Sequence, residues 1–205
     1  MRALILVDLQ YDFMPGGALA VAHGDETIAI ANRLAPHFST IVATQDWHPR
    51  DHGSFAANHA GKHPGEMIDL HGQLQVLWPV HCVQETHGAE LHGELDRARI
   101  TEVFRKGTDP TVDSYSGFFD NGKRKATGLA EWLRARWISR LYVMGLATDY
   151  CVKYTVLDAR SLGFDVWVIE DGCRAVELKP GDSDRALAEM RGAGAAIVES
   201  GAIGP

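Results

Sequence analysis

The run Ala3-Leu4-Ile5-Leu6-Val7 near the amino terminus is short and apolar and is followed at once by Asp8, which predicts a buried strand ending at a polar residue. The amphipathic stretch 25–38 then predicts a helix, and the run 40–44 predicts a second strand. A strand, a helix and another strand in this order are typical of a βαβ unit with two parallel strands. This opening indicates the α/β class.

The same alternation resumes after a long irregular segment. It predicts further strands over 102–105, 141–145, 166–170 and 195–199, and helices over 128–137, 149–162 and 183–192. Six strands that alternate with helices predict a three-layer fold, in which helices cover both faces of a mostly parallel sheet. At 205 residues, we expect one domain over 1–205.

Charge and composition limit the kinds of molecule that we expect this protein to bind. The formal net charge is -7 and no cluster of lysine or arginine is present, so we expect no nucleic-acid partner and favour a small-molecule substrate. No apolar run reaches 18 residues, so we expect no membrane partner. The three cysteines are scattered and odd in number, which favours a reducing, cytoplasmic location. The oligomeric state stays open, a homo-oligomer included.

The stretch Gly145-Leu146-Ala147-Thr148-Asp149-Tyr150-Cys151-Val152 carries the clearest chemical signal. Its small residues allow a tight turn after a strand, and Thr148 or Asp149 can cap a helix that has Cys151 in its first turn. The positive end of a helix lowers a thiol pKa, so we predict that Cys151 is a nucleophile with a lowered pKa. We expect Cys82 and Cys173 to be buried and inert.

Two other polar residues end predicted strands. Asp8 follows the first strand and Lys106 follows the strand 102–105. Because ligands of open α/β sheets bind beyond the carboxyl ends of the strands, we expect both residues to lie near Cys151. A shielded carboxylate has a raised pKa, so Asp8 can take the thiol proton, and Lys106 can balance the charge.

The polar segment of about 45–100 has the pattern of a metal-binding loop region. Asp46 and His48 lie two apart after a predicted strand, so their side chains face the same side, and His81 supplies a third ligand. These donors suit one divalent metal ion, for which Zn²⁺ is our first choice and Fe²⁺ or Mn²⁺ are alternatives. We do not include His52 in this core set. Three roles stay open for it: a fourth ligand, a hydrogen-bond partner of a ligand, or a loop residue that makes other hydrogen bonds. We expect the remaining histidines of the loop to face solvent: His59, His63, His71, His87 and His92.

Taken together, these motifs resemble those of the nicotinamidases (pyrazinamidases) in the isochorismatase-like cysteine hydrolase superfamily. The resemblance covers Asp8 to about Asp171 and is carried by the segments 8–13, 46–49, 78–82, 106–108, 113–119 and 147–152. The cysteine motif is shared across the superfamily. The Asp46-Trp47-His48 and Trp78-Pro79-Val80-His81-Cys82 motifs are more particular to nicotinamidases.

The resemblance implies hydrolysis of nicotinamide to nicotinate and ammonia through a cysteine thioester, activity on pyrazinamide, and a place in NAD salvage. It implies that Asp8, Lys106 and Cys151 are catalytic and that Asp46, His48 and His81 bind the metal. It also implies a cis peptide before Ala147, with the backbone N–H groups of Ala147 and Cys151 facing the oxyanion. Phe13, Trp78 and Tyr115 match residues that line the ring pocket.

Two alternatives remain at this stage. One is a hydrolase of carbamoyl or ureido compounds with the same three catalytic residues and no metal. The other is a metal-binding or redox-sensing protein that uses Cys151 as a reversible switch, which would explain a reactive thiol but leaves Asp8 and Lys106 without a task.

Overall fold

The computed structural model describes residues 1–204 and contains one central six-stranded sheet in the order β5-β2-β1-β6-β7-β8. All of its neighbouring strands are parallel. The strands are β1 (Arg2–Val7), β2 (Ile41–Asp46), β5 (Glu102–Lys106), β6 (Arg140–Leu146), β7 (Asp165–Arg174) and β8 (Ala196–Val198). The predicted α/β fold class and the parallel sheet are therefore confirmed.

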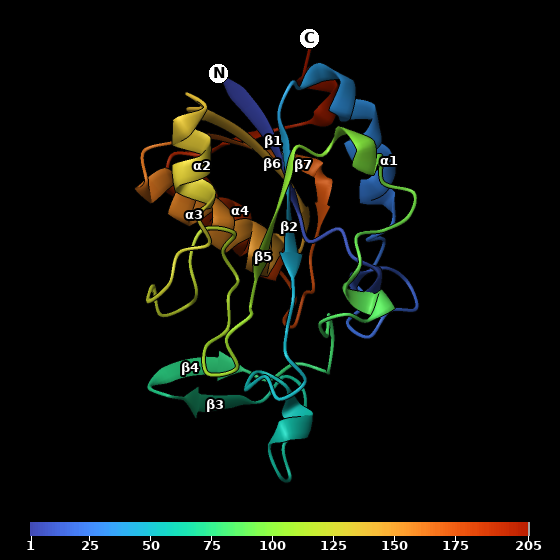
Figure 1. Ribbon diagram of the computed structural model, residues 1–205, viewed down its shortest axis with the longest axis vertical. Helices are drawn as coiled ribbons and strands as arrows, with labels where there is room; N and C mark the ends of the chain where they lie inside the picture. Colours follow the sequence, from blue (N-terminus) through green and yellow to red (C-terminus); the bar gives the residue numbers. More distant parts are fainter. Residues whose placement is uncertain (205) are drawn as a thin grey trace.

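Helices cover both faces of the sheet (Figure 1). Helix α1 packs against β6 and β7 on one face, and the other three helices lie on the opposite face, where α3 contacts β7 and α4 contacts β8. The strand β1 lies between the helical layers, and its residues 3–7 are at most 2% exposed. The helices are α1 (Glu26–Leu34), α2 (Leu129–Ala135), α3 (Lys153–Ser161) and α4 (Asp182–Gly192). None of the helices in the described part of the chain has the length and apolar character needed to cross a membrane.

Some element boundaries differ from the sequence prediction. The helix expected over 25–38 ends as α1 at Leu34, and a 3-10 turn that contains Pro36 continues it to His37. The strand expected over 166–170 extends to Arg174 as β7, with a bulge in its pairing to β6. The helix expected from 149 starts as a π-helical turn over Thr148–Val152 and continues as α3.

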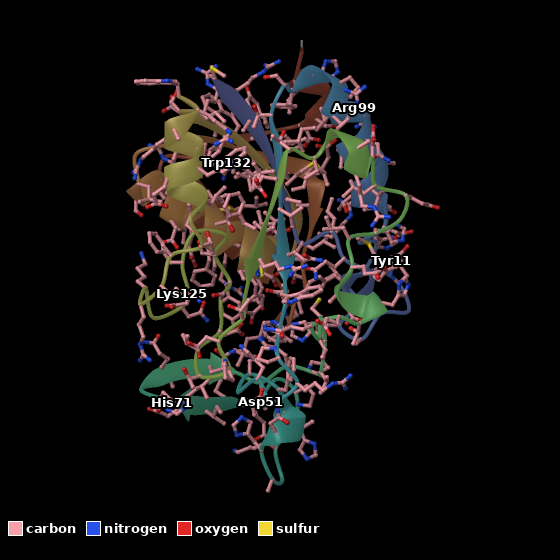
Figure 2. All side chains as sticks on the ribbon, viewed as in Figure 1. Tyr11, Asp51, His71, Arg99, Lys125 and Trp132 are labelled. Carbon is pink, nitrogen blue, oxygen red and sulfur yellow. The ribbon has the colours of Figure 1, made fainter. Side chains whose placement is uncertain are left out.

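The long segment after β2 contains a hairpin that the sequence did not predict. Its strands are β3 (Met67–Leu70) and β4 (Gln73–Val76), and they pair antiparallel. The two residues between them, His71 and Gly72, both have positive φ, at 51° and 85°, as a two-residue hairpin turn requires. Figure 2 shows His71 and Asp51 at the end of the molecule that this segment forms.

The topology places the chemistry at one edge of the sheet. The chain runs from β1 outward to β2 and β5, and then returns to the other side of β1 as β6. Asp8 follows β1, Lys106 ends β5, and Cys151 follows β6. In open α/β sheets, a reversal of strand order such as that between β1 and β6 creates the ligand crevice at the carboxyl ends of the strands.

Candidate active site

Lys106 lies at the centre of a buried cluster. Its Nζ lies 2.8 Å from Asp8 Oδ2 and 2.6 Å from Asp46 Oδ1. It also donates to the Ser114 carbonyl at 2.9 Å and to Cys151 Sγ at 3.3 Å. Burial alone would lower the pKa of this ammonium, but Asp46 and Asp8 outweigh burial and hold the pKa well above its usual value. Lys106 is therefore a permanent cation between two carboxylates and a thiol.

The two carboxylate oxygens of Asp8 have different partners. The Thr44 hydroxyl donates to Oδ1 at 2.6 Å, and the Asp8 backbone N–H donates back to the same hydroxyl at 3.2 Å. Oδ2 is fully buried and makes no hydrogen bond of good geometry, although Lys106 is close. Burial raises the pKa of Asp8 against the opposing effect of Lys106. Because its pKa is raised, this carboxylate can accept a proton on Oδ2.

Cys151 occupies the π-helical turn, where the residue is 7% exposed. Burial raises its pKa well above the usual value, and the neighbouring Lys106 only partly opposes this effect. The expected lowering of the thiol pKa by the helix terminus is thus wrong, because desolvation outweighs the nearby positive charge. The resting side chain is a thiol and needs a base. The peptide bond between Leu146 and Ala147 is cis, as the family resemblance implied.

The importance of the Thr44 contact can be tested through pH dependence. Replacing Thr44 by valine removes the hydroxyl that favours the charged form of Asp8, so its already raised pKa rises further. We expect the acidic limb of the kcat/KM profile to move to higher pH by about one unit. The control is Thr155→Val, which removes a buried hydroxyl that accepts from the Gly117 backbone. An unshifted acidic limb in Thr44→Val would contradict this role of Asp8.

The second cluster consists of Asp46, His48 and His81. Asp46 Oδ2 lies 3.6 Å from His48 Nε2 and 4.0 Å from His81 Nε2. The Nδ1 atoms of the histidines bond backbone carbonyls, His48 to Gly107 O and His81 to Pro79 O, each at 2.8 Å. A carbonyl can only accept, so both Nδ1 atoms carry hydrogen and both Nε2 lone pairs are free when the rings are neutral. One carboxylate oxygen and two Nε2 atoms within 4.8 Å of one another match the donors that divalent transition metals prefer.

The charges in this cluster also fit a cation. Burial would raise the pKa of Asp46, but Lys106 and His48 outweigh burial and lower it, so the residue is a carboxylate. Burial and the neighbouring His48 lower the pKa of His81 to about 4, which leaves this ring neutral. Burial would lower the pKa of His48 too, but the adjacent Asp46 outweighs burial and raises it. The negative charge of Asp46 favours a proton on His48, and a bound cation would take the place of that proton.

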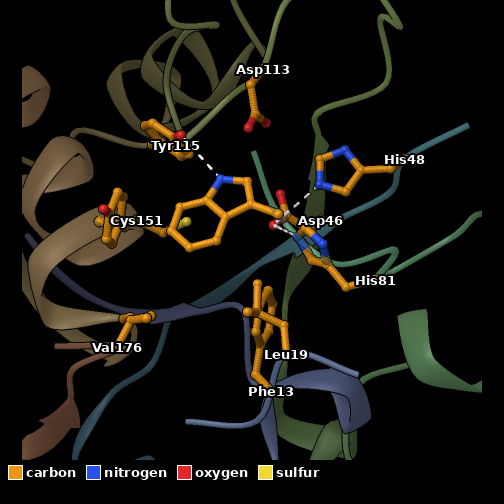
Figure 3. A pocket seen from close by; sticks show the side chains of 12 residues that line it. Phe13, Leu19, Asp46, His48, His81, Asp113, Tyr115, Cys151 and Val176 are labelled. Atoms are coloured by element: carbon orange, nitrogen blue, oxygen red, sulfur yellow. Dashed lines mark hydrogen bonds and ion pairs between the residues drawn. The ribbon is translucent and has the colours of Figure 1, made fainter. Parts of the chain in front are cut away.

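A cavity joins the two clusters. Figure 3 shows Cys151 on one side of it, His48 and His81 on the other, and Phe13 and Leu19 along its floor in this view. Trp78 and Tyr115 also line it, and the Tyr115 hydroxyl accepts from Trp78 Nε1 at 3.2 Å. The arrangement can hold a flat apolar ring, with a nucleophile near one of its edges and a metal site near another.

Comparison with known proteins matches residues 2–202 to the isochorismatase domain. The chain belongs to the isochorismatase family. It is 55% identical to the nicotinamidase of Escherichia coli strain K12 over 96% of this chain and 93% of that protein. The nicotinamidase/pyrazinamidase structure from Acinetobacter baumannii is similar with a TM-score of 0.95 at 46% identity, over 98% of this chain and 96% of that one. A pyrazinamidase of Pyrococcus horikoshii, solved in complex with zinc, gives a TM-score of 0.78 at 40% identity over 97% and 98% of the chains.

In this isochorismatase-family chain, the structure brings together all the residues predicted to be catalytic or to bind the metal. Asp8, Lys106 and Cys151 form one cluster and Asp46, His48 and His81 the other, with Asp46 touching both. The predicted ring-pocket residues line the cavity that holds Ala147 and Cys151: Phe13, Trp78 and Tyr115.

His52 lies beside the metal cluster, with its ring centroid 4.3 Å from that of His48. Its Nδ1 lies 2.7 Å from the Ser54 hydroxyl and 3.2 Å from the Ser54 backbone nitrogen. The Val112 carbonyl lies near the ring, but Nε2 has no hydrogen-bond partner. His48, His52 and Asp113 also offer ligand atoms within 4.8 Å of one another, so His52 stays a candidate beside the set formed by Asp46, His48 and His81.

Several residues near the site had no distinct signal in the sequence. Leu19, Asp113, Tyr150 and Val176 line the cavity without having been singled out. Tyr150 could have been found from its place next to Cys151 in the motif. The carboxylate of Asp113 and the Tyr115 hydroxyl both accept from Gln75 Nε2, at 3.0 and 2.9 Å, so strand β4 helps to hold the pocket wall.

Proposed function

We propose that this chain hydrolyses nicotinamide to nicotinate and ammonia through a thioester on Cys151, and that it also accepts pyrazinamide. The observation that carries the proposal is the cavity that has the Cys151 thiol at one end, in contact with the buried Lys106 and Asp8 pair, and the Asp46, His48 and His81 donors at the other. The high identity to nicotinamidases supports the substrate and the class of enzyme, a hydrolase of linear carboxamides. Formation of nicotinate places the reaction in NAD salvage.

The first half of the reaction makes the thioester. Asp8 Oδ2 takes the Cys151 proton, the sulfur attacks the carboxamide carbon, and the amide oxygen becomes an oxyanion. We assign the backbone N–H groups of Ala147 and Cys151 to this oxyanion, where each donor is worth about 3 kcal/mol. Asp8 then returns the proton to the leaving nitrogen, the C–N bond breaks and ammonia departs.

The second half uses the same residues in reverse. Asp8 takes a proton from water, the resulting oxygen nucleophile attacks the thioester carbon, and the C–S bond breaks. Asp8 passes the proton taken from water to the sulfur, and the carboxylic acid formed gives up its own proton to solvent, so the products are nicotinate and the original thiol. Lys106 stays charged throughout and balances whichever of Asp8 and Cys151 is negative.

We assign Asp46, His48 and His81 to one divalent ion, with Zn²⁺ as the first choice because their donors match it and a similar pyrazinamidase is described with zinc. When bound, the ion supplies a Lewis acid for the ring nitrogen of the substrate. Around it, Phe13, Trp78 and Tyr115 hold the plane of the ring and exclude water.

Three further assignments are proposals of the same kind. One hydrolase domain over residues 1–205 is supported by one central sheet whose strands extend from residue 2 to residue 198. A cytoplasmic location follows from three cysteines that are all free thiols. The net charge of -7 favours a small-molecule partner over nucleic acid.

A substrate panel tests the proposal. Purified, reduced and Zn²⁺-loaded protein is assayed for ammonia release from nicotinamide, pyrazinamide, and a carbamoyl and a ureido compound. We expect release from the two ring carboxamides. Turnover confined to the carbamoyl or ureido compound, unaffected by a chelator, would instead identify the metal-free hydrolase of the same superfamily.

A further inference from the structure

We infer that Gln10 is a positioning residue that fixes the backbone of Asp46, and thereby the carboxylate shared by the catalytic and metal clusters. The inference rests on the proposed function for the identity of the bound ion. Gln10 is fully buried and lies two residues after Asp8, yet it contacts neither Lys106 nor Cys151 through a hydrogen bond. Its effect on the site must therefore pass through another residue.

Strand β2 loses its backbone partner on the β1 side before it reaches Asp46. The register of β1 with β2 ends at the pair Leu6 and Ala43. Asp8 then adopts a positive φ of 51°, which no extended strand allows, so the chain after β1 turns away. In a strand, the N–H and C=O of one residue point to the same side, so both backbone groups of Asp46 would face this side without a partner.

The side chain of Gln10 takes the place of the missing strand. Its Nε2 donates to the Asp46 carbonyl at 2.8 Å, and its Oε1 accepts from the Asp46 N–H at 2.8 Å. On the other side, Asp46 is in register with Lys106 of β5, and the Trp47 N–H donates to the Lys106 carbonyl at 2.9 Å. The primary amide of Gln10 thus makes the two backbone hydrogen bonds to Asp46 that a residue of a neighbouring strand would otherwise make.

The position of the Asp46 backbone matters because its carboxylate has two tasks. Oδ1 lies 2.6 Å from Lys106 Nζ, and Oδ2 faces His48 and His81. A rotation of the Asp46 backbone would move both carboxylate oxygens relative to these partners. Gln10 therefore determines whether one carboxylate can serve the metal and the catalytic ammonium together.

The test is Gln10→Met, which keeps the length of the side chain and removes the amide. Gln45→Met is the matched control, because Gln45 is also buried, precedes Asp46 and donates to the same Ala89 carbonyl as Gln10, at 2.8 and 2.9 Å respectively. Both variants lose the bond to Ala89, but only Gln10→Met releases the Asp46 backbone. The affinity for Zn²⁺ is measured by competition with a chelator, and the visible spectrum of the Co²⁺-loaded protein reports the ligand set.

We expect Gln10→Met to weaken Zn²⁺ binding by at least about tenfold and to change the Co²⁺ spectrum, with Gln45→Met within about twofold of the wild type. Equal losses in the two variants, or unchanged binding in Gln10→Met, would overturn the inference. If the methionine variant does not fold, Gln10→Glu replaces it, because this variant keeps the acceptor for the Asp46 N–H but loses the donor to the Asp46 carbonyl. The same Zn²⁺ affinity and Co²⁺ spectrum are measured, with the same expected result. A wild-type chain with no measurable affinity for Zn²⁺ would overturn the metal part of the proposed function and the inference with it.

Discussion

Replacing Cys151 by alanine is expected to lower kcat for nicotinamide by at least about 10⁴-fold, because no other group can form the covalent intermediate. The metal donors and the aromatic walls of the cavity lie on other segments and stay in place. The dissociation constant for nicotinamide should therefore stay within about threefold of the wild-type value. Ammonia release measures the first quantity and isothermal titration the second.

The matched control for this loss is Cys173→Ala. Cys173 is also a buried thiol, but its Sγ donates to the Ile169 carbonyl and it lies on β7. We expect this variant to keep its turnover. Residual activity of Cys151→Ala within about tenfold of the wild type would exclude Cys151 as the nucleophile.

The second large effect is expected for Asp46→Asn, because this residue belongs to both clusters. The substitution keeps the shape but removes the charge that draws cations toward His48 and His81 and that faces Lys106 at 2.6 Å. We expect at least about a 100-fold loss of Zn²⁺ affinity and about a 10³-fold loss of kcat/KM. Metal content after dialysis and the rate of ammonia release measure the two losses.

An exposed aspartate supplies the comparison. Asp69→Asn changes the same functional group in the hairpin strand β3, away from both clusters, and should alter neither quantity. Chelator-treated wild type should lose its activity and regain it with Zn²⁺, whereas Asp46→Asn should not recover at the same Zn²⁺ concentration. Asp46→Asn protein that retained one Zn²⁺ per chain and normal turnover would contradict the assignment of the ligands.

The sheet could be predicted because its signals are local. Each strand is a short apolar run, and polar residues such as Asp8 and Lys106 follow or end those runs. The hairpin β3–β4 could not be predicted in the same way. Its turn is His71-Gly72 rather than the stronger Asn-Gly signal, and hydropathy does not follow its two faces, because Gln75 is buried while Met67 and Leu74 are exposed.

Site residues could be predicted where the residue type and its motif indicate a chemical role, as for Asp46, His48, His81 and Cys151. What could not be predicted are the contacts that depend on register and burial. Gln10 and Thr44 are ordinary polar residues in the sequence, and their roles follow from which backbone or carboxylate they face across the sheet. The pKa of Cys151 was mispredicted for the same reason, since its burial outweighs the positive charge nearby.

The most direct test of the central claim is to trap the thioester with hydroxylamine while ammonia and nicotinate are measured during turnover of nicotinamide. Ammonia leaves when the thioester forms, and the thioester then reacts with either water or hydroxylamine. We therefore expect nicotinohydroxamate to increase with the hydroxylamine concentration while nicotinate decreases. The amount of ammonia should equal the sum of these two products. Equal amounts of ammonia and nicotinate, with no hydroxamate at any hydroxylamine concentration, would mean that water attacks the amide directly and that Cys151 forms no thioester.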